Sequence, residues 1–478
     1  MGQQAAPQSA QHELPPGLRN NPHRCQLSGC QRASGQALRH RCVLALLVLV
    51  ACEPRGEEQG SVFDEWAAAV VEQSTLRWGG QRVARVFAAP PAAGVAQWRS
   101  WRTPLRLHAA RPVASAALAQ WGMALEQAYL QLQSADWPLP LPDLAGGSSE
   151  FDVYLQENGD WPTVHTACCA PPAPLDAALS FATLPWTPVA APRPCVVLAL
   201  LAEAGLHGLD PAEAPPWRTA TAHWLAATWL GSSACLGAAF AYAQGQCDRG
   251  LLPEHGPPGT GALLVAYLAQ TLAPAASARP QWVRQWWDFA RQRTWDDGDW
   301  RGSPDLWETL AVLAKAQGRR LIEVVRSFNL WRWSLPELPD AVWQDAPRPT
   351  TTALAWPTVG QPQRYWRPRP LQAWGTQYLR LKRSAPTATG ELRVWLTGEY
   401  GVRWSLQLVR LDAQGRRRGT VQAPVRRAGQ VYLPLQLDTK DADVLIVVTN
   451  LSSRPPDADV RDDNGRAFRL TAQWQPRS

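Results

Sequence analysis

Lysine is almost absent from this 478-residue chain, so its basic charge rests almost entirely on arginine. The lysines are Lys315, Lys382 and Lys440, a scarcity that we attribute to codon composition rather than to function. An excess of one charge is also missing from most of the chain. The formal net charge is +7, but residues 1–51 hold five arginines and one acid, which leaves 42 basic and 39 acidic residues beyond them. That small surplus predicts no nucleic-acid partner.

An apolar run near the N-terminus is too short to span a bilayer. It has ten residues, Cys42–Ala51, and follows the basic Arg39-His40-Arg41, as in a signal peptide. Its end, Leu49-Val50-Ala51-Cys52, has the order of a bacterial lipobox. We therefore predict a lipoprotein cleaved before Cys52 and held in a membrane by the acylated cysteine, whereas a buried strand with a chance cysteine is the alternative. Glu53 favours the outer membrane, facing the periplasm or the surface.

Common catalytic and metal-binding signatures are missing as well. The sequence has no Gly-x-Ser-x-Gly elbow, P-loop or dinucleotide fingerprint, so those enzyme classes have no support. The cysteines beyond Cys52 lack the spacing of a zinc site. In an exported protein they favour disulfides, and their odd number leaves one unpaired. The short-range options, which we predict, pair Cys235 with Cys247 and Cys195 with Cys168 or Cys169.

The most informative segment is residues 194–231. It reads as an apolar helix, a short Asp-Pro turn, and a second helix that opens after Pro215-Pro216-Trp217. This segment resembles the core of a myxobacterial family of secreted gluzincin-like zinc metalloproteases. In that family the first helix carries H-E-x-x-H, and the second opens with Trp followed by Glu-Ala-Thr-Ala, whose Glu is the third zinc ligand. The resemblance covers about residues 104–335.

The residues that would bind zinc are not there. Alignment on Trp217 puts Leu200 and Ala204 at the two histidine positions, Leu201 at the catalytic glutamate and Thr219 at the third ligand. A zinc hydrolase needs three protein ligands and a general base beside the bound water. We therefore predict no catalytic residue, no metal ligand and no cofactor, as expected of a pseudoprotease.

A shifted register leaves one alternative open. It reads the motif on Glu203-Ala204-Gly205-Leu206-His207, which keeps two possible ligands four residues apart on one helix face, with Ala204 at the base position. With His223 from the next helix, Glu203 and His207 would form an unorthodox zinc site. The simpler interpretation is that Glu203 and His207 are an ordinary helix pair and that His223 packs beside Trp224.

The surrounding pattern predicts an α+β fold of the zincin type. A strand at Leu105–Ala109, a helix at Val113–Leu132 and a strand at Phe151–Leu155 precede the motif helix, which is the order of a zincin upper subdomain. The helical lower subdomain is expected at residues 260–272, 281–292, 303–316 and 319–331.

The C-terminal part of the chain changes to strand-like alternation. Six segments predict an all-β sandwich, at residues 378–382, 392–396, 404–411, 430–435, 442–448 and 467–472. Asp457, Asp459, Asp462 and Asp463 lack the full calcium-loop pattern, so we interpret them as a solvated turn.

These observations predict five parts of the chain: an N-terminal extension and signal peptide (1–51), an N-terminal segment (52–103), a degenerate gluzincin-like domain (104–346), a Pro-rich linker (347–370) and the sandwich (371–478). Residues 1–38 are polar and unusual for a signal peptide, and a true start near Leu38 would explain them. The favoured function is binding or scaffolding of a protein or peptide at the cell envelope by an inactive metalloprotease-like fold. The alternative is a zinc metallopeptidase with a displaced site.

Overall fold

The structure is a computed structural model, and it describes most of the chain beyond residue 80. The described residues are 82–83, 88–91, 94–142, 149–157, 159–167, 177–187, 191–252, 256–291, 300–301, 306–338, 341–343, 346–366, 370–383, 388–424, 429–451 and 465–477. The chain divides into Met1–Ser61 and Val62–Ser478, and every described residue belongs to the second unit. Cys52, Cys168, Cys169 and the four aspartates at 457–463 lie outside the described residues.

The first domain is built on a five-stranded mixed sheet. Its strands, in spatial order, are β2 (Ala96–Arg99), β3 (Leu105–Ala109), β4 (Phe151–Gln156), β6 (Ser180–Pro185) and β5 (Thr163–Thr166). The three central strands are parallel, while β2 and β5 are antiparallel edge strands. Strands β3 and β4 confirm the predicted segments. Strands β2, β5 and β6 were not predicted, and β2 lies in what was expected to be an N-terminal segment.

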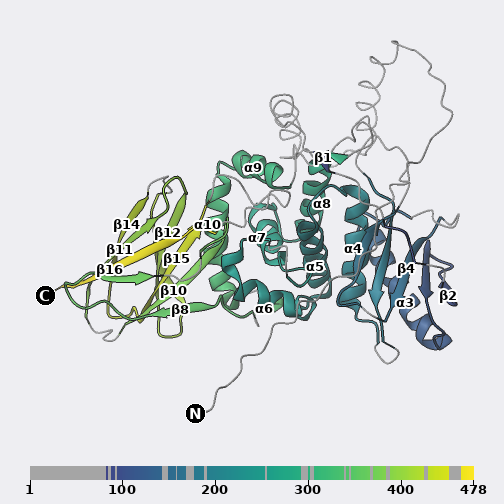
Figure 1. Ribbon diagram of the computed structural model, residues 1–478, viewed down its shortest axis with the longest axis horizontal. Coiled ribbons are helices and arrows are strands. Elements are labelled where there is room, and N and C mark those ends of the chain that lie inside the picture. The colour runs from purple at the N-terminus through teal and green to yellow at the C-terminus, as the bar shows by residue number, and fades with distance from the viewer. Residues whose placement is uncertain are drawn as a thin grey trace, which may run out of the picture. The chain divides into compact units, whose positions relative to one another are not determined.

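Two helices cover one face of this sheet, as Figure 1 shows: α3 (Ser115–Ser134) and α4 (Pro194–Leu209). On α3 the buried residues Leu118, Trp121 and Leu125 recur every three or four positions, which places one stripe of the helix against the strands. The inward side chains of β3 and β4 join the same hydrophobic core. The predicted strand, helix, strand and motif helix follow one another in this order, but β5 and β6 are inserted between the second strand and the motif helix.

The remaining helices include the predicted second helix (α5), the predicted helical run (α7 to α10) and one helix that was not predicted (α6). They are α5 (Pro215–Leu230), α6 (Gly237–Gly245), α7 (Ala262–Leu272), α8 (Arg279–Ala290), α9 (Leu306–Ala316) and α10 (Leu321–Ser334). Buried tryptophans hold them together, because the Trp217 ring lies edge-on to Trp286 and Trp307, with centroids 5.3 and 4.9 Å away. A two-stranded ribbon pairs β1 (Arg82–Val83) with β7 (Trp300–Arg301). No described helix is long and apolar enough to cross a bilayer.

The C-terminal part is a sandwich of two sheets. The five-stranded sheet consists of β13 (Arg417–Gln422), β12 (Trp404–Leu411), β15 (Asp443–Asn450), β10 (Thr376–Lys382) and β8 (Thr351–Leu354). The four-stranded sheet consists of β14 (Gln430–Leu437), β11 (Gly390–Gly398), β16 (Phe468–Pro476) and β9 (Gln363–Trp366). All six predicted strands are present, and their inward residues form a separate core.

The predicted linker at residues 347–370 differs from the structure. Strand β8 pairs in parallel with β10, and β9 pairs with β16, so this segment contributes one edge strand to each sheet. Its prolines suggested a linker, but proline is tolerated beside and between edge strands, where a ladder hydrogen bond is not needed.

The five-stranded sheet lies between helix α10 and the four-stranded sheet. Asn329 on α10 donates a hydrogen bond from Nδ2 to Thr449 Oγ1 (2.9 Å), and Tyr378 OH donates to the Asn329 carbonyl oxygen (2.8 Å). Trp333 packs with Tyr378, Val409 and other outward residues of the five-stranded sheet in a third apolar cluster. One face of this sheet therefore packs on α10, and the other packs on the second sheet.

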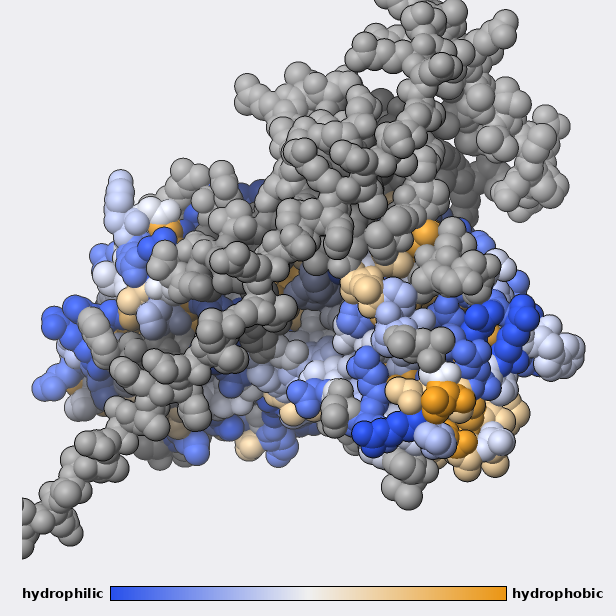
Figure 2. All heavy atoms as spheres, turned by 45° about the vertical axis from the view of Figure 1, so that its right-hand side comes forward, coloured by the Kyte–Doolittle hydropathy of each residue, from blue (hydrophilic) through white to orange (hydrophobic). Residues whose placement is uncertain are grey.

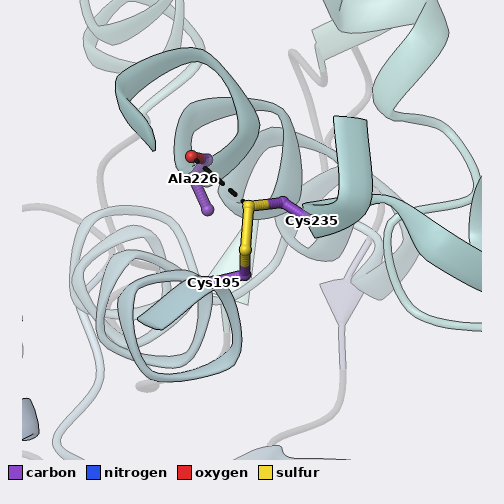
Figure 3. The surroundings of a disulfide bond; sticks show 3 residues. All are labelled: Cys195, Ala226 and Cys235. Atoms are coloured by element: carbon purple, nitrogen blue, oxygen red, sulfur yellow. Dashed lines mark hydrogen bonds between the residues drawn. A yellow bond between two sulfur atoms is a disulfide. The ribbon is translucent and has the colours of Figure 1, made fainter. Parts of the chain in front are cut away.

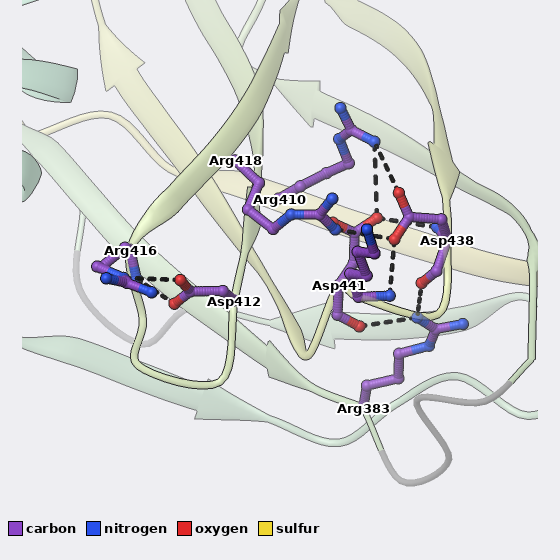
Figure 4. A network of polar contacts seen from close by, with 8 residues as sticks. Arg383, Arg410, Asp412, Arg416, Arg418, Asp438 and Asp441 are labelled. Carbon is purple, nitrogen blue, oxygen red and sulfur yellow. Dashed lines mark hydrogen bonds and ion pairs between the residues drawn. The ribbon is translucent and has the colours of Figure 1, made fainter.

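An arginine–aspartate network connects the strand ends of the five-stranded sheet (Figure 4). The fully buried Asp441 carboxylate accepts from Arg418 Nη1 at 2.7 Å and from the Asp438 backbone N–H at 2.9 Å. Arg383 Nη1 donates to the carbonyl oxygens of Asp438 and Asp441, at 2.7 and 2.8 Å. The buried charge is thus fully surrounded by donors, as burial of a carboxylate requires.

Candidate functional site

The candidate site lies on the helix pair α4–α5. Each helix begins with a proline in its first turn, where the missing N–H would have no helical partner. The turn at Asp210-Pro211 reverses the chain between them. Gly205 on α4 is required by a close approach, because a Cβ there would collide with the Pro138 carbonyl oxygen. These features fix α4 between the chain at Pro138 and helix α5.

The positions that would bind zinc hold packed apolar side chains. Leu200, Leu201 and Ala204 are at most 2 % exposed and belong to the main hydrophobic core. Thr219 is partly buried, and its hydroxyl donates to the Pro216 carbonyl oxygen three residues earlier (3.3 Å). In this register the helix pair offers methyl groups and one hydroxyl that is already hydrogen-bonded.

His207, the histidine of the shifted register, is buried on α4 and faces the edge strand β5. Its Nε2 lies 2.6 Å from Thr166 Oγ1, and Nδ1 has no hydrogen-bond partner. Burial and the nearby charges of Arg218 and His165 lower the pKa of His207 well below its ordinary value. The imidazole is therefore neutral at physiological pH.

Glu203 lies one turn earlier on α4. Burial between the helices raises the pKa of its carboxyl to about 7, and the positive charge of Arg218 on α5 opposes this rise. Arg218 itself is buried and donates to the carbonyl oxygens of Pro211 (3.0 Å) and Glu213. The sequence reasoning missed Arg218, although an arginine directly after Trp217 in an otherwise apolar helix was a visible signal.

His223 is held away from the other two candidates by packing. Its ring lies against Gly259, which has a φ of +84° and where a Cβ would come within 2.5 Å of the His223 Cγ. Burial lowers the pKa of His223, and a hydrogen bond with the Cys235 backbone opposes this. Within the described part of the chain, no three His, Cys, Asp or Glu side chains gather closely enough to hold a metal ion, so Glu203, His207 and His223 do not form one cluster.

The predicted disulfide pairing was wrong. Cys195 bonds to Cys235, with their Cα atoms 5.1 Å apart, and Cys247 is a buried free thiol (Figure 3). Helix α6 separates Cys235 from Cys247, and its nine residues span roughly 13 Å, too far for a disulfide. The reversal between α4 and α5 instead brings the start of α4 beside the chain that follows α5. A short separation along the sequence therefore did not predict which cysteines pair.

A second polar region on the far face of the first sheet was not predicted. His108 Nε2 lies 2.8 Å from Asp152 Oδ1 on the neighbouring strand, and both residues are buried. On the edge strand β5, His165 stacks on Phe181 and its Nε2 lies 3.0 Å from Thr183 Oγ1. A cleft of about 420 Å³ lies beside His165. The alternation of side chains along these strands could have indicated that His108, Asp152 and His165 lie on the same face of the sheet.

Comparisons with known proteins do not identify this chain. No family model matches it, and no curated protein is similar to it. Aminopeptidase A of Legionella pneumophila is 10 % identical over 70 % of this chain and 34 % of its own, with a TM-score of 0.29. The periplasmic inhibitor of g-type lysozyme from Aeromonas hydrophila is 13 % identical over 26 % of this chain and 100 % of its own, with a TM-score of 0.17. Scores this low carry no argument about fold or function.

Proposed function

We propose that this chain is an exported lipoprotein, anchored through Cys52 in the outer membrane, whose degenerate gluzincin-like domain binds or scaffolds a protein or peptide. The support for the zincin-like interpretation is the element order β3, α3, β4, β5, β6, α4 and α5, with the antiparallel edge strand β5 beside α4. The support for the lipid anchor remains the sequence Leu49-Val50-Ala51-Cys52.

The observation that carries the proposal is what occupies the motif positions. Leu200 and Ala204 lie in the main core, and His207 is held by the Thr166 hydroxyl. Opening a coordination site there would bury polar groups among leucines and break a buried hydrogen bond. A catalytic zinc also needs hydrogen-bonded support around its ligands. The helix pair is therefore better suited to be part of the packed core than to hold a metal.

Metal content and proteolysis test the inactive site. The purified full chain is dialysed, its zinc is measured, and casein digestion is followed with and without a chelator. We expect neither stoichiometric zinc nor cleavage. About one zinc per chain, with chelator-sensitive cleavage that is lost in His207→Ala and His223→Ala, would replace this proposal by the metallopeptidase alternative. Zinc without cleavage would indicate a structural metal site.

Detergent partitioning tests the anchor separately. The parent chain is expected in the detergent phase, because a lipoprotein cysteine carries more than one acyl chain. Cys52→Ala should move the chain to the aqueous phase. A Cys52→Ala chain that still partitions with membranes would refute the lipid anchor and leave the inactive-site proposal standing.

A further inference from the structure

The outer face of the sheet β14-β11-β16-β9 has an unusual set of side chains. Burial alternates strictly along β14, β11 and β16, so one set of residues fills the sandwich core and the other points outward. We call the outward set the outer face. Its described members are Arg364, Glu391, Arg393, Trp395, Thr397, Gln430, Tyr432, Pro434, Gln436, Arg469, Thr471, Gln473 and Gln475.

The helices lie on the other side of the sandwich. Helix α10 packs on the five-stranded sheet through Asn329 and Trp333, and that sheet separates it from the four-stranded sheet. Figure 1 shows β14, β11 and β16 side by side at this end of the sandwich. None of the main contacts between the described elements joins a helix to β14, β11, β16 or β9.

An aromatic pair occupies the middle of the outer face. Trp395 on β11 and Tyr432 on β14 lie directly opposite each other, with ring centroids 5.3 Å apart and planes 36° apart. Tyr432 is 46 % exposed. Figure 2 shows both hydrophilic and hydrophobic side chains on the visible described surface. Aromatic rings of this kind offer apolar faces beside polar edges.

Three planar polar groups are fixed beside the rings. Glu391 accepts hydrogen bonds from Arg393 Nε and from Gln436 Nε2, each 2.6 Å long. Glu391, Arg393 and Trp395 alternate along one strand and therefore share one face. A guanidinium, a carboxylate and an amide are thus positioned before any ligand arrives, which reduces the entropy cost of binding.

The remaining members of the outer face identify its partner. Apart from Pro434 they are glutamine, threonine and arginine, whereas the centre of a protein–protein interface is apolar. Arg364 and Arg393 accompany Glu391 among the described members, so these three side chains carry a net positive charge. A nucleic acid is not favoured, because the chain beyond residue 51 has little net positive charge.

We propose that the outer face binds an acidic polysaccharide, a chain of sugar rings that carry carboxylates. The C–H faces of a sugar ring pack on Trp395 and Tyr432. Hydroxyl groups bond to the Gln436 and Arg393 side chains, and uronate carboxylates pair with Arg364 and Arg393. This site is distinct from the α4–α5 site and depends neither on the lipid anchor nor on an inactive metal site.

Calorimetric titration of the full chain with polygalacturonate tests the proposal. Its methyl ester is the matched neutral ligand, because it has the same rings without the charges. We expect binding of the acid form and at least about fivefold weaker binding of the ester. Trp395→Ala and Tyr432→Ala are each expected to weaken binding by about fivefold or more, since an aromatic contact is removed and charge is unchanged.

Tyr400→Ala is the control, because Tyr400 is 93 % exposed and lies outside the outer face. It should bind like the parent, and all three variants should melt at the parent temperature. Binding that survives both aromatic substitutions would be non-specific attraction to a basic protein and would overturn the proposal. Equal binding of the ester, binding of single-stranded oligodeoxythymidine in place of the polysaccharide, or no binding would each overturn it too.

Discussion

His207 on α4 and Thr166 on the edge strand β5 are joined by a buried 2.6 Å hydrogen bond between Nε2 and Oγ1. This bond ties helix α4 to the edge of the sheet and gives the Nε2 atom of His207 a partner within the protein. Thr166→Val should lower the free energy of unfolding by about 1 to 3 kcal/mol, because the imidazole keeps its burial and loses its partner. Urea unfolding at pH 7.5 measures this.

The control for that variant is Thr166→Ser, which keeps the hydroxyl. We expect Thr166→Ser to lie much closer to the parent than Thr166→Val. If the two variants lost equal stability, the threonine methyl group and not the hydrogen bond would be the important contact.

The same histidine predicts a loss of stability in acid. Burial, together with the charges of Arg218 and His165, lowers the pKa of His207 well below 6.5, so the folded chain holds it neutral while the unfolded chain protonates it. Its contribution is therefore present above pH 6.5 and is lost as the pH falls below that value. In His207→Gln the fall in unfolding free energy between pH 7 and pH 5 should be smaller than in the parent. Identical pH profiles would contradict this.

The raised pKa of Glu203 predicts the opposite dependence of stability on pH. Burial raises its pKa to about 7 from 4.5, so the folded chain keeps a proton that the unfolded chain has lost. Stability is therefore lost as the pH rises from 4.5 through 7, by roughly 2 to 3 kcal/mol. Glu203→Gln should be more stable than the parent by about that amount at pH 8 and nearly equal to it at pH 4.

Glu323→Gln is the matched control for the Glu203 variant. Hydrogen bonds from Arg320 lower the pKa of the exposed Glu323, so its removal should not stabilise the chain at pH 8. A Glu203→Gln chain that is less stable than the parent at pH 8 would mean that attraction to Arg218 outweighs the burial of the carboxyl.

The sequence predicted the elements of this fold better than their connections. Periodic apolar residues such as Leu118, Trp121 and Leu125 placed α3, and strict alternation placed the six sandwich strands. Short edge strands escaped notice, because β5 and β9 have four residues each and owe their structure to pairing with β6 and β16. Such partners are distant in the sequence.

The candidate site shows the same limit. The sequence showed directly that Leu200, Ala204 and Thr219 stand at the positions aligned with the zinc ligands of the resembled family. The partners of His207 and Glu203 could not, because Thr166 and Arg218 come from a different strand and a different helix. The predicted disulfide pairing was wrong for the same reason, since the fold brings together cysteines 40 residues apart.

The observed disulfide makes a direct prediction for non-reduced peptide mapping. The peptide that contains Cys195 should be linked to the one that contains Cys235, and Cys247 should be free to react after denaturation. A closed loop of this length contributes about 4 kcal/mol in the chain-entropy description. Cys195→Ser should lose most of that stability under oxidising conditions and little under reducing ones. A linked Cys235–Cys247 peptide would refute the pairing.

The network around Asp441 predicts where the sandwich is most sensitive to loss of one charge. The Asp441 carboxylate is fully buried and accepts from Arg418 and from the Asp438 backbone, while Arg410 lies 3.7 Å away (Figure 4). Asp441→Asn keeps the shape but replaces an acceptor by a donor that faces arginine. We expect a loss of about 2 to 4 kcal/mol in urea unfolding, because an amide N–H would face Arg418 and only the more exposed Asp438 would remain as its counter-charge.

Asp412→Asn is the control for Asp441→Asn, since Asp412 pairs with Arg416 at the exposed turn of the same sheet. Solvent screens that pair, so its variant should lose clearly less stability than Asp441→Asn. Equal losses would show that the burial of Asp441 is not what makes it important.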